Sequence, residues 1–236
     1  KKNTSHTIGV VVPTIANPFY ASVVFGVEEE ARLNGYGVMA CNTLQDPALE
    51  EEYVRTLLEK QVKGLIIASI AGGKAHLERA AGLGVRIVAV DQYVEMDGIA
   101  QIDFDYRAGG YMAAKYLLER GHRRIGYAAF RLDRPSRRRI LEGYLDAMRE
   151  AGLEPLVAEA DAGERYGAGY EFDTGMKLTR RLLECDPPPT AIFAGNDLMA
   201  FGVIQELARR GVRLPEDVSV MGFDGIEYGR MIHPPL

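Results

Sequence analysis

The stretch Ile8–Tyr36, IGVVVPTIANPFYASVVFGVEEEARLNGY, has the pattern of a buried strand followed by a turn and a helix. Its first residues form a short apolar run, Ile8–Val12, rich in β-branched side chains, and a helical pattern follows over Asn17–Asn34. Asn17 is suited to cap this helix and Pro18 to its first position. The stretch therefore predicts one strand–helix unit of an α/β fold.

The same pattern recurs in the second half of the chain, as IGYAAFRLDRPSRRRILEGYLDAMREAGL (Ile125–Leu153). At one constant offset, Ile8 coincides with Ile125, Gly9 with Gly126, Gly26 with Gly143 and Gly35 with Gly152. Further along, GLIIAS (Gly64–Ser69) corresponds to TAIFAGN (Thr190–Asn196), and each half then reaches an aspartate, Asp91 or Asp224. A single glycine match means little because glycine is common in turns, but this ordered series indicates two similar halves.

Strand and helix patterns alternate along both halves, which is typical of parallel sheets covered by helices. The remaining expected strands are Val38–Cys41, Leu65–Ala68, Ile87–Val90, Ile125–Phe130, Ala191–Ala194 and Val218–Phe223. The remaining expected helices are Pro47–Gln61, Lys74–Leu83, Ala108–Arg120, Ser136–Ala151, Gly169–Glu184 and Leu198–Arg210. We predict an α/β protein of two similar doubly wound parallel-sheet lobes with a ligand cleft between them. Residues 1–104 form the first lobe, residues 105–233 the second, and residues 234–236 begin a crossing back to the first lobe.

Composition excludes several classes of function. The 236 residues suffice for two domains of ordinary size, and the net charge of -5 makes this segment a poor DNA binder. Cys41 and Cys185 lie far apart and show no CxxC or Cys/His spacing, so neither a disulfide framework nor a zinc site is indicated, and reduced thiols in a cytoplasmic protein are preferred. The four histidines are scattered, and no apolar run is long enough to span a membrane. We therefore expect no metal, no cofactor, no catalytic residues and no membrane partner.

Open parallel sheets bind ligands at the carboxyl ends of their strands. The residues found there are Phe19, Tyr20, Ser69, Asp91 and Gln92 in the first half and Arg134, Ser136, Asn196, Asp197 and Asp224 in the second. If the lobes face each other, these residues line one cleft, with Asp103–Asp105 as the hinge between the lobes and residues 233–236 as a second crossing.

Asp91 and Asp224 each end a hydrophobic strand, where packing does not require a carboxylate. Either residue could cap a helix or form a turn, but a carboxylate can also accept two hydroxyl hydrogen bonds from a polyol. Because both halves place one there, we favour a ligand role. Of the adjacent pair Asn196 and Asp197, we expect Asn196 to contact the ligand and Asp197 to cap the helix.

The run RLDRPSRRR, Arg131–Arg139, would place arginines in the first turn of a helix capped by Ser136. Cations there oppose the helix dipole, so an anion should compensate. That anion could be Asp133, with an Arg138–Glu142 pair and the rest solvated, or it could be a ligand held by Arg134 and Arg139. The sequence does not choose between these alternatives.

With these features together, the chain resembles the effector-binding core of LacI/GalR-family transcriptional repressors, which share the two-lobe fold of periplasmic sugar-binding proteins. The resemblance spans nearly the whole chain and is most specific in PTAIFAGNDLMAFGVIQELARRGVRLPEDVSVMGFD, Pro189–Asp224. It implies an N-terminal helix-turn-helix domain, a linker ending near Lys1–Thr7, a dimer formed through the core, and a further piece of the first lobe after residue 236.

The resemblance also implies effector contacts at matching positions. Phe19 and Tyr20 fall where the family stacks an aromatic ring on the effector, and Ser69 and Asp91 lie in its first-lobe contact loops. Phe104 and Asp105 lie at the crossing, and the second-lobe contacts are Arg134, Ser136, Asn196 and Asp224. Two positions depart from the family pattern: Ile140 stands where an effector-gripping arginine is usual and Tyr106 where an asparagine is usual. Both departures count against a standard hexose or pentose.

We therefore expect a cytoplasmic sensor that binds a sugar, a sugar phosphate or a nucleoside-like effector and reaches operator DNA only through the missing domain. The helix Asn17–Asn34 offers Ala21, Val24, Phe25 and Glu28 for a homodimer. The alternative is a periplasmic-type solute-binding protein for a sugar transporter.

Overall fold

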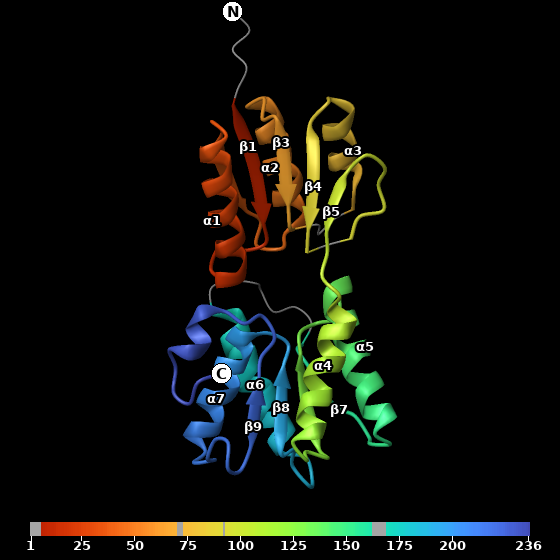
Figure 1. Cartoon of the computed structure of the whole chain (residues 1–236), viewed down its shortest axis with the longest axis vertical. Helices are drawn as coiled ribbons and strands as arrows, with labels where there is room; N and C mark the ends of the chain where they lie inside the picture. The colour runs from red at the N-terminus through yellow and green to blue at the C-terminus, as the bar shows by residue number, and fades with distance from the viewer. Residues whose placement is uncertain (1–5, 70–72, 92, 162–168) are drawn as a thin grey trace, which may run out of the picture. The chain divides into compact units, whose positions relative to one another are not determined.

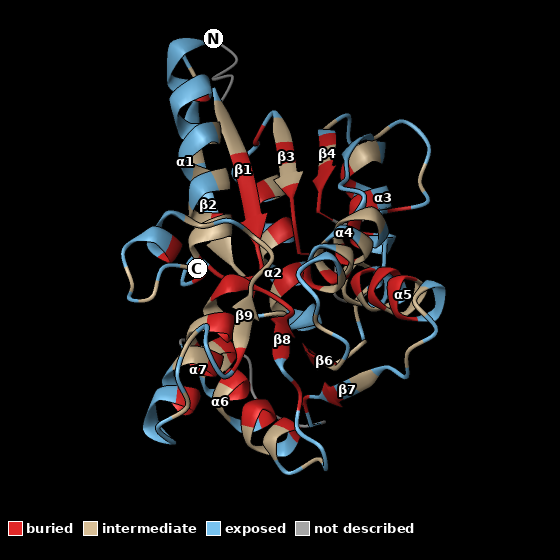
Figure 2. Ribbon diagram, turned by 60° about the horizontal axis from the view of Figure 1, so that its bottom comes forward, coloured by how far each residue is buried: buried red, intermediate tan, exposed pale blue. Residues whose placement is uncertain are grey.

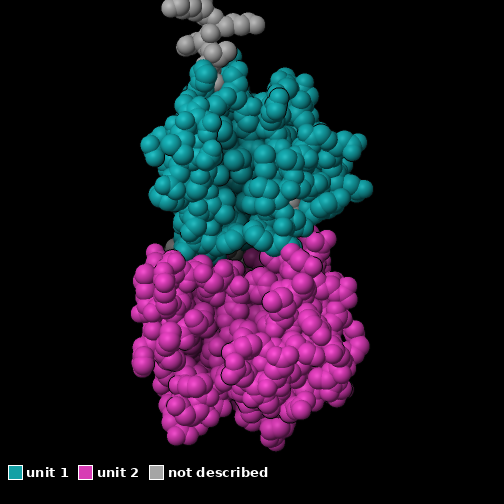
Figure 3. All heavy atoms as spheres, viewed as in Figure 1, with its two compact units in different colours: residues 1–104 teal, residues 105–236 magenta. Residues whose placement is uncertain are grey.

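The computed structural model describes residues 6–69, 73–91, 93–161 and 169–236. Two compact units divide the chain, residues 1–104 and residues 105–236 (Figure 3). Each unit is built on its own all-parallel sheet, which confirms the expected α/β class with two parallel sheets. In the described part of the chain, no helix has the length and apolar character that crossing a membrane requires. Gln92 and the first five residues of the expected linker end lie outside the described residues.

The first unit has a five-stranded sheet in the order β2-β1-β3-β4-β5 (Figure 1). Its strands are β1 Thr7–Val12, β2 Gly37–Asn42, β3 Gly64–Ile67, β4 Arg86–Val90 and β5 Ala100–Ile102. Its helices are α1 Pro18–Leu33, α2 Pro47–Glu59 and α3 Ala75–Gly82. Helix α1 packs on one face, where Tyr20 clusters with Val10 and Val12 of β1, whereas α2 and α3 cover the other face through Leu57 and Leu77.

The second unit repeats this order with four strands, β7-β6-β8-β9. Its strands are β6 Ile125–Ala129, β7 Leu156–Glu159, β8 Ala191–Ala194 and β9 Ser219–Met221. Its helices are α4 Tyr106–Glu119, α5 Pro135–Glu150, α6 Tyr170–Leu183 and α7 Asp197–Arg209, followed by the short 3-10 helix η1 Glu227–Arg230. Strands β6 and β8 are buried along their whole length (Figure 2), with α4 and α5 on one face and α6 and α7 on the other.

Two paired glycines show how far the two halves correspond. Gly35 and Gly152 both follow a helix with positive φ, 75° and 66°, the left-handed conformation that ends a helix. Gly26 and Gly143 differ. A Cβ on Gly143 would lie 2.0 Å from the carbonyl oxygen of Arg107, because α4 crosses α5 there, whereas a Cβ on Gly26 would meet open space. The two halves therefore correspond in their strands and turns. They differ at the first helix after the first strand, because α5 packs on α4 at Gly143 whereas among the described residues α1 has no such neighbour at Gly26.

Two short strands were not expected from the sequence. Among the strands of the described residues, β5 pairs only with β4 and β7 only with β6, so each is an edge strand held by one neighbour. Each is three or four residues long, too short for a clear alternating pattern. The backbone hydrogen bonds of the neighbouring strand therefore define these elements more than their own residues do.

Candidate functional site

Both sheets reverse their strand order beside the first strand of the unit, between β1 and β3 in one and between β6 and β8 in the other. Such reversal points leave a crevice at the carboxyl ends of the strands, where ligands of open α/β sheets bind. The expected site residues lie in the loops or first helical turns beyond these ends: Phe19, Tyr20, Ser69, Asp91 and Phe104 in the first unit, and Arg134, Ser136, Asn196 and Asp224 in the second. Asp105, the tenth, directly follows the division between the units.

The loop between β1 and α1 carries the two aromatic residues into the carboxyl edge of the first sheet. Asn17 caps α1 by accepting the backbone N–H of Phe19 at 2.9 Å, and Pro18 takes the first helical position, as the sequence predicts. The Phe19 ring then packs edge-on against Tyr20, with centroids 5.0 Å apart, and against Phe104, with centroids 6.1 Å apart. Phe104 remains 46% exposed, so this aromatic cluster has an open side.

The Tyr20 hydroxyl donates a 2.6 Å hydrogen bond to Oδ2 of Asp91. Both side chains are buried, and Asp91 has a φ of 63°, in the left-handed region that non-glycine residues rarely adopt. A residue held in this conformation by its surroundings is typical of functional sites. One carboxylate oxygen of Asp91 therefore serves Tyr20, which is a partner that the sequence did not reveal.

Ser69 follows β3 and lies 2.5 Å from the hydroxyl of Thr43, which follows β2. Both hydroxyls are buried. Thr43 was not among the expected site residues, although a polar residue directly after an expected strand is the signal that could have found it. The pair ties two neighbouring strand ends together.

In the second unit, the expectation that Asp197 caps the helix after β8 is wrong, because Asn196 is the cap. Asn196 is the N-cap of α7 and accepts the backbone N–H of Met199 at 2.8 Å. Asp197 instead accepts the backbone N–H groups of Phe223 at 2.9 Å and Ile226 at 2.7 Å. Either residue type can cap a helix, so the correction comes from the loop after β9, which needs a carboxylate at the second position.

The cap of α5 also differs from expectation. Arg134, not Ser136, occupies the N-cap position, and its side chain makes no capping hydrogen bond, because Pro135 begins the helix and moves Ser136 into its first turn. Asp105 caps α4, accepting the backbone N–H of Ala108 at 2.9 Å. Asp105 thus has a structural role besides any contact with a ligand.

Asp133 compensates part of the arginine cluster. It pairs with Arg131 and with Arg137, the latter at 2.9 Å, and Arg138 donates to the carbonyl oxygen of Leu132 at 2.7 Å. Burial opposes ionisation of Asp133, but the hydrogen bonds from Arg131 and Arg137 outweigh it and lower the pKa of this carboxyl. Arg137 also lies over the Phe130 ring, 4.8 Å from its centroid.

The two departures from the family pattern are explained by packing. Ile140 is buried in the core between α4, α5 and the sheet, so it does not replace the usual arginine as a polar contact. Tyr106 is also buried and stacks on Phe223, with centroids 6.1 Å apart. Both residues therefore belong to the hydrophobic core of the second unit.

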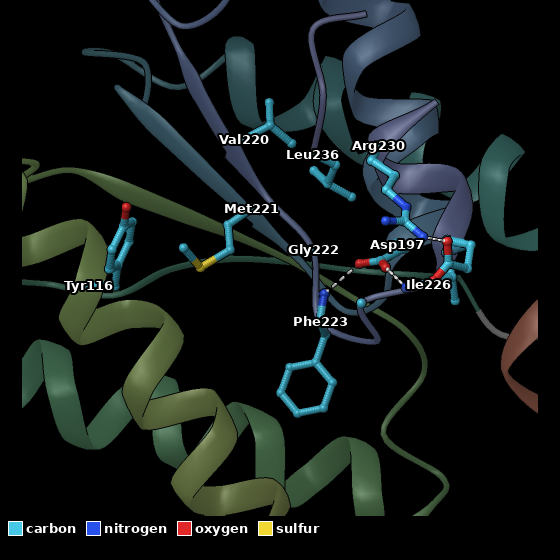
Figure 4. A pocket seen from close by; sticks show the side chains of 12 residues that line it. Tyr116, Asp197, Val220, Met221, Gly222, Phe223, Ile226, Arg230 and Leu236 are labelled. Atoms are coloured by element: carbon cyan, nitrogen blue, oxygen red, sulfur yellow. Dashed lines mark hydrogen bonds and ion pairs between the residues drawn. The ribbon is translucent and has the colours of Figure 1, made fainter. Parts of the chain in front are cut away.

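A pocket of about 500 Å³ lies beside the loop that follows β9 (Figure 4). Its lining includes Tyr116, Asp197, Met221, Ile226 and Leu236, but none of the ten expected site residues. Among the described residues, no group of three or more potential metal ligands comes together. The chemistry of the expected residues, aromatic faces beside carboxylates and amides, suits a polar organic ligand.

Comparison with known proteins shows which proteins this chain is similar to. Residues 5–233 match the family of periplasmic binding proteins and sugar-binding domains of the LacI family. The repressor PurR of Actinobacillus pleuropneumoniae is 33% identical over 236 residues, which cover 100% of this chain and 69% of that protein. The ribose operon repressor of Escherichia coli K12 is 34% identical over 237 residues, covering 100% and 70%.

Solved structures of transcriptional regulators have the same fold as this chain. A LacI family transcriptional regulator from Enterococcus faecium with bound ribose aligns with a TM-score of 0.86 and 28% identity, covering 98% of this chain and 82% of that one. A putative ribose operon repressor from Burkholderia thailandensis aligns with a TM-score of 0.83 and 31% identity, covering 98% and 84%.

Proposed function

Since this chain belongs to the LacI family and is the effector-sensing domain of a transcriptional regulator, we propose that its effector is a small polar ring compound: a sugar, a sugar phosphate or a nucleoside. The observation that carries this proposal is the aromatic cluster of Phe19, Tyr20 and Phe104, joined through Tyr20 to the buried carboxylate of Asp91. Aromatic faces pack on the flat side of a ring, while a carboxylate accepts its hydroxyl groups. A relative of 28% identity with bound ribose is consistent with this class.

We assign the other half of the effector's contacts to the second unit. Asp224 accepts hydroxyl hydrogen bonds, and Arg134 with Ser136 donates to the effector from the start of α5. The Oδ1 atom of Asn196 caps α7, so its NH2 group is the part that we assign to the effector. A ligand that takes contacts from both units links them energetically, because it favours whichever arrangement of the units offers both sets of contacts.

The output of this sensor is DNA binding by a helix-turn-helix domain outside this chain, in the cytoplasm. The curated relatives are repressors, which favours a regulator over a solute-binding protein for a transporter. Binding without turnover suffices for this role, so we propose no catalytic step. The coupling consists of the difference in effector affinity between two arrangements of the units.

We also propose a homodimer that uses the outer face of α1. Phe25 and Leu33 are 61% and 73% exposed on this helix, and the neighbouring edge strand β2 exposes Met39. Sedimentation of the wild type should show a concentration-dependent dimer that Phe25→Glu weakens. A wild type that remains monomeric at high concentration would rule out this interface.

The effector proposal is tested by a thermal-shift screen across pentoses, hexoses, phosphosugars and nucleosides. At least one compound should raise the melting temperature, and Asp224→Ala should reduce that rise. If no compound in the panel shifts the wild type, and Asp224→Ala changes no response, the sensor proposal fails.

A further inference from the structure

The carboxylate of Asp197 is the anchor of the loop that carries Asp224. Asp197 is the first residue of α7 and only 3% exposed. Its Oδ1 accepts the backbone N–H of Phe223 and its Oδ2 that of Ile226, at 2.9 and 2.7 Å (Figure 4). These two bonds hold the loop on either side of Asp224.

Two glycines shape this loop. Gly225, directly after Asp224, adopts a φ of 69°, a left-handed conformation that glycine reaches without steric cost. Gly222, just before the first anchored residue, approaches the carboxylate so closely that an added Cβ would lie 2.1 Å from Oδ1 of Asp197. The loop is therefore bound to one side chain at Phe223 and Ile226, and its backbone passes directly against that carboxylate.

Both ends of this loop need a hydrogen-bond acceptor, and at this position only a carboxylate accepts both bonds. Two backbone N–H groups need two acceptors, and the two oxygens of Asp197 supply them. An asparagine would offer one oxygen and turn its NH2 group toward the other N–H donor. Replacing the carboxylate would therefore leave a partly buried backbone donor without this acceptor and move one end of the loop. The start of α7 also favours a negative charge at this position.

We propose that Asp197 is a positioning residue for effector binding: it holds the backbone of residues 223–226 so that Asp224 meets the effector in a fixed geometry. This inference rests on the proposed role of Asp224 as an effector contact. We assign Asp197 no contact with the effector, since its side chain is buried and both of its oxygens accept backbone bonds of the loop. Its effect on binding is therefore exerted through Asp224.

A double-mutant cycle tests this claim, because a residue that acts only through Asp224 has no effect once Asp224 is removed. The panel is D-ribose, D-xylulose, ribose 5-phosphate and adenosine, and the compound with the largest thermal shift serves as the probe. In calorimetric titrations, Asp197→Asn should weaken binding at least about tenfold in the wild-type background, a loss of about 1.4 kcal/mol. In the Asp224→Ala background, Asp197→Asn should change the affinity less than about twofold.

Two further variants separate positioning from general destabilisation. Gly222→Ala displaces the same carboxylate without changing any charge, and it should weaken binding like Asp197→Asn. Glu206→Gln is the matched control, because Glu206 is another buried carboxylate of α7 but is held by Arg180 and Arg210, away from the loop. It should lower the melting temperature and leave the affinity for the probe unchanged.

The outcomes distinguish this inference from the proposed function. If no probe binds, the proposed function fails and this inference fails with it; if a probe binds but Asp224→Ala leaves its affinity unchanged, the proposed role of Asp224 fails, and this inference fails with that role. If Asp224→Ala weakens binding but Asp197→Asn costs the same in both backgrounds, or if Glu206→Gln weakens binding equally, positioning by Asp197 is refuted alone. Amide hydrogen exchange of the wild type adds a measurement without variants: the amides of Phe223 and Ile226 should be protected before ligand is added, and rapid exchange at both would overturn the anchor.

Discussion

Asp91 and Asp224 occupy corresponding ends of the two halves, but their surroundings differ at the level of single atoms. Asp91 is buried and accepts a hydrogen bond from Tyr20, whereas Asp224 lies in a loop whose backbone N–H groups donate to Asp197. One aspartate is thus fixed by a side chain bonded to it and the other by a side chain bonded to its neighbours. Both arrangements keep a carboxylate in place before any ligand arrives, which lowers the entropy lost on binding.

Removal of the Tyr20 hydroxyl tests how much its hydrogen bond to Asp91 contributes to the stability of the protein. Tyr20→Phe takes away a hydrogen-bond donor to a buried carboxylate, so the free energy of unfolding should fall by about 1–3 kcal/mol. Urea denaturation measures the change. Tyr93→Phe is the matched control, because the same atom is removed from a largely exposed side chain, and it should cost less than about 0.5 kcal/mol. Equal stabilities for wild type and Tyr20→Phe would show that the hydroxyl bond contributes nothing.

The structural roles that the sequence predicted correctly belong to residues whose interaction partners lie nearby in the sequence. Asn17 and Pro18 begin α1 as expected because a cap and a first-turn proline act within three residues. The capping of α7 by Asn196 in place of Asp197 could not be foreseen, because Asp197 is bound instead to a loop 26 residues further along the chain. The Tyr20–Asp91 bond likewise joins residues 71 positions apart. Such partners depend on the folded arrangement and leave no local signal.

At the scale of elements, the two halves share strands and turns but bury their first helices differently. Helix α5 packs closely on α4, whereas the face of α1 that carries Gly26 is open in the described structure. Matching glycines predicted the repeat correctly, yet the same glycine has opposite surroundings in the two halves. The short edge strands β5 and β7 were missed for a related reason, since their pairing partners determine them.

This difference predicts opposite effects for one substitution. Gly143→Ala should destabilise the protein by about 1–3 kcal/mol or more, because its Cβ would collide with the backbone of α4. Gly26→Ala should be neutral or stabilising by up to about 1 kcal/mol, because alanine favours a helix and meets no neighbour. Thermal denaturation of both variants checks the pair, and a similar loss in both would contradict the helix contact.

Helices α6 and α7 are joined by an ion-pair network that predicts acid sensitivity. Hydrogen bonds from Arg180 and Arg210 lower the pKa of Glu206 from its ordinary 4.5 to about 2. Because the folded-state pKa lies below the unfolded value, this network stabilises the protein above pH 4.5, and its contribution is lost as the pH falls toward 2. The wild type should therefore lose stability across that interval, and Glu206→Gln should lose less. Identical pH profiles for both proteins, measured by urea denaturation, would exclude the network as a source of acid sensitivity.

At the scale of the whole molecule, the sequence repeat, the two matching strand orders and the family comparison point to one design. Two sheets each present polar and aromatic residues at their carboxyl ends, which is where a small molecule can contact open parallel sheets. The α/β class and the family were predictable because periodic patterns and long motifs carry them. The identity of the effector was not, because it depends on the distances between side chains of different loops. Ile140 and Tyr106 illustrate this limit: the sequence marks them as unusual, and only the structure shows that they are core residues.

The central claim is that one effector molecule takes contacts from both units. Calorimetric titration with the best ligand of the panel, carried out on the wild type, Asp91→Asn and Asp224→Asn, tests it most directly. We predict one ligand bound per chain and a loss of affinity of at least about tenfold for each variant, because each removes a charged acceptor from the same ligand. Two ligands per chain, or full affinity in either variant, would contradict the claim.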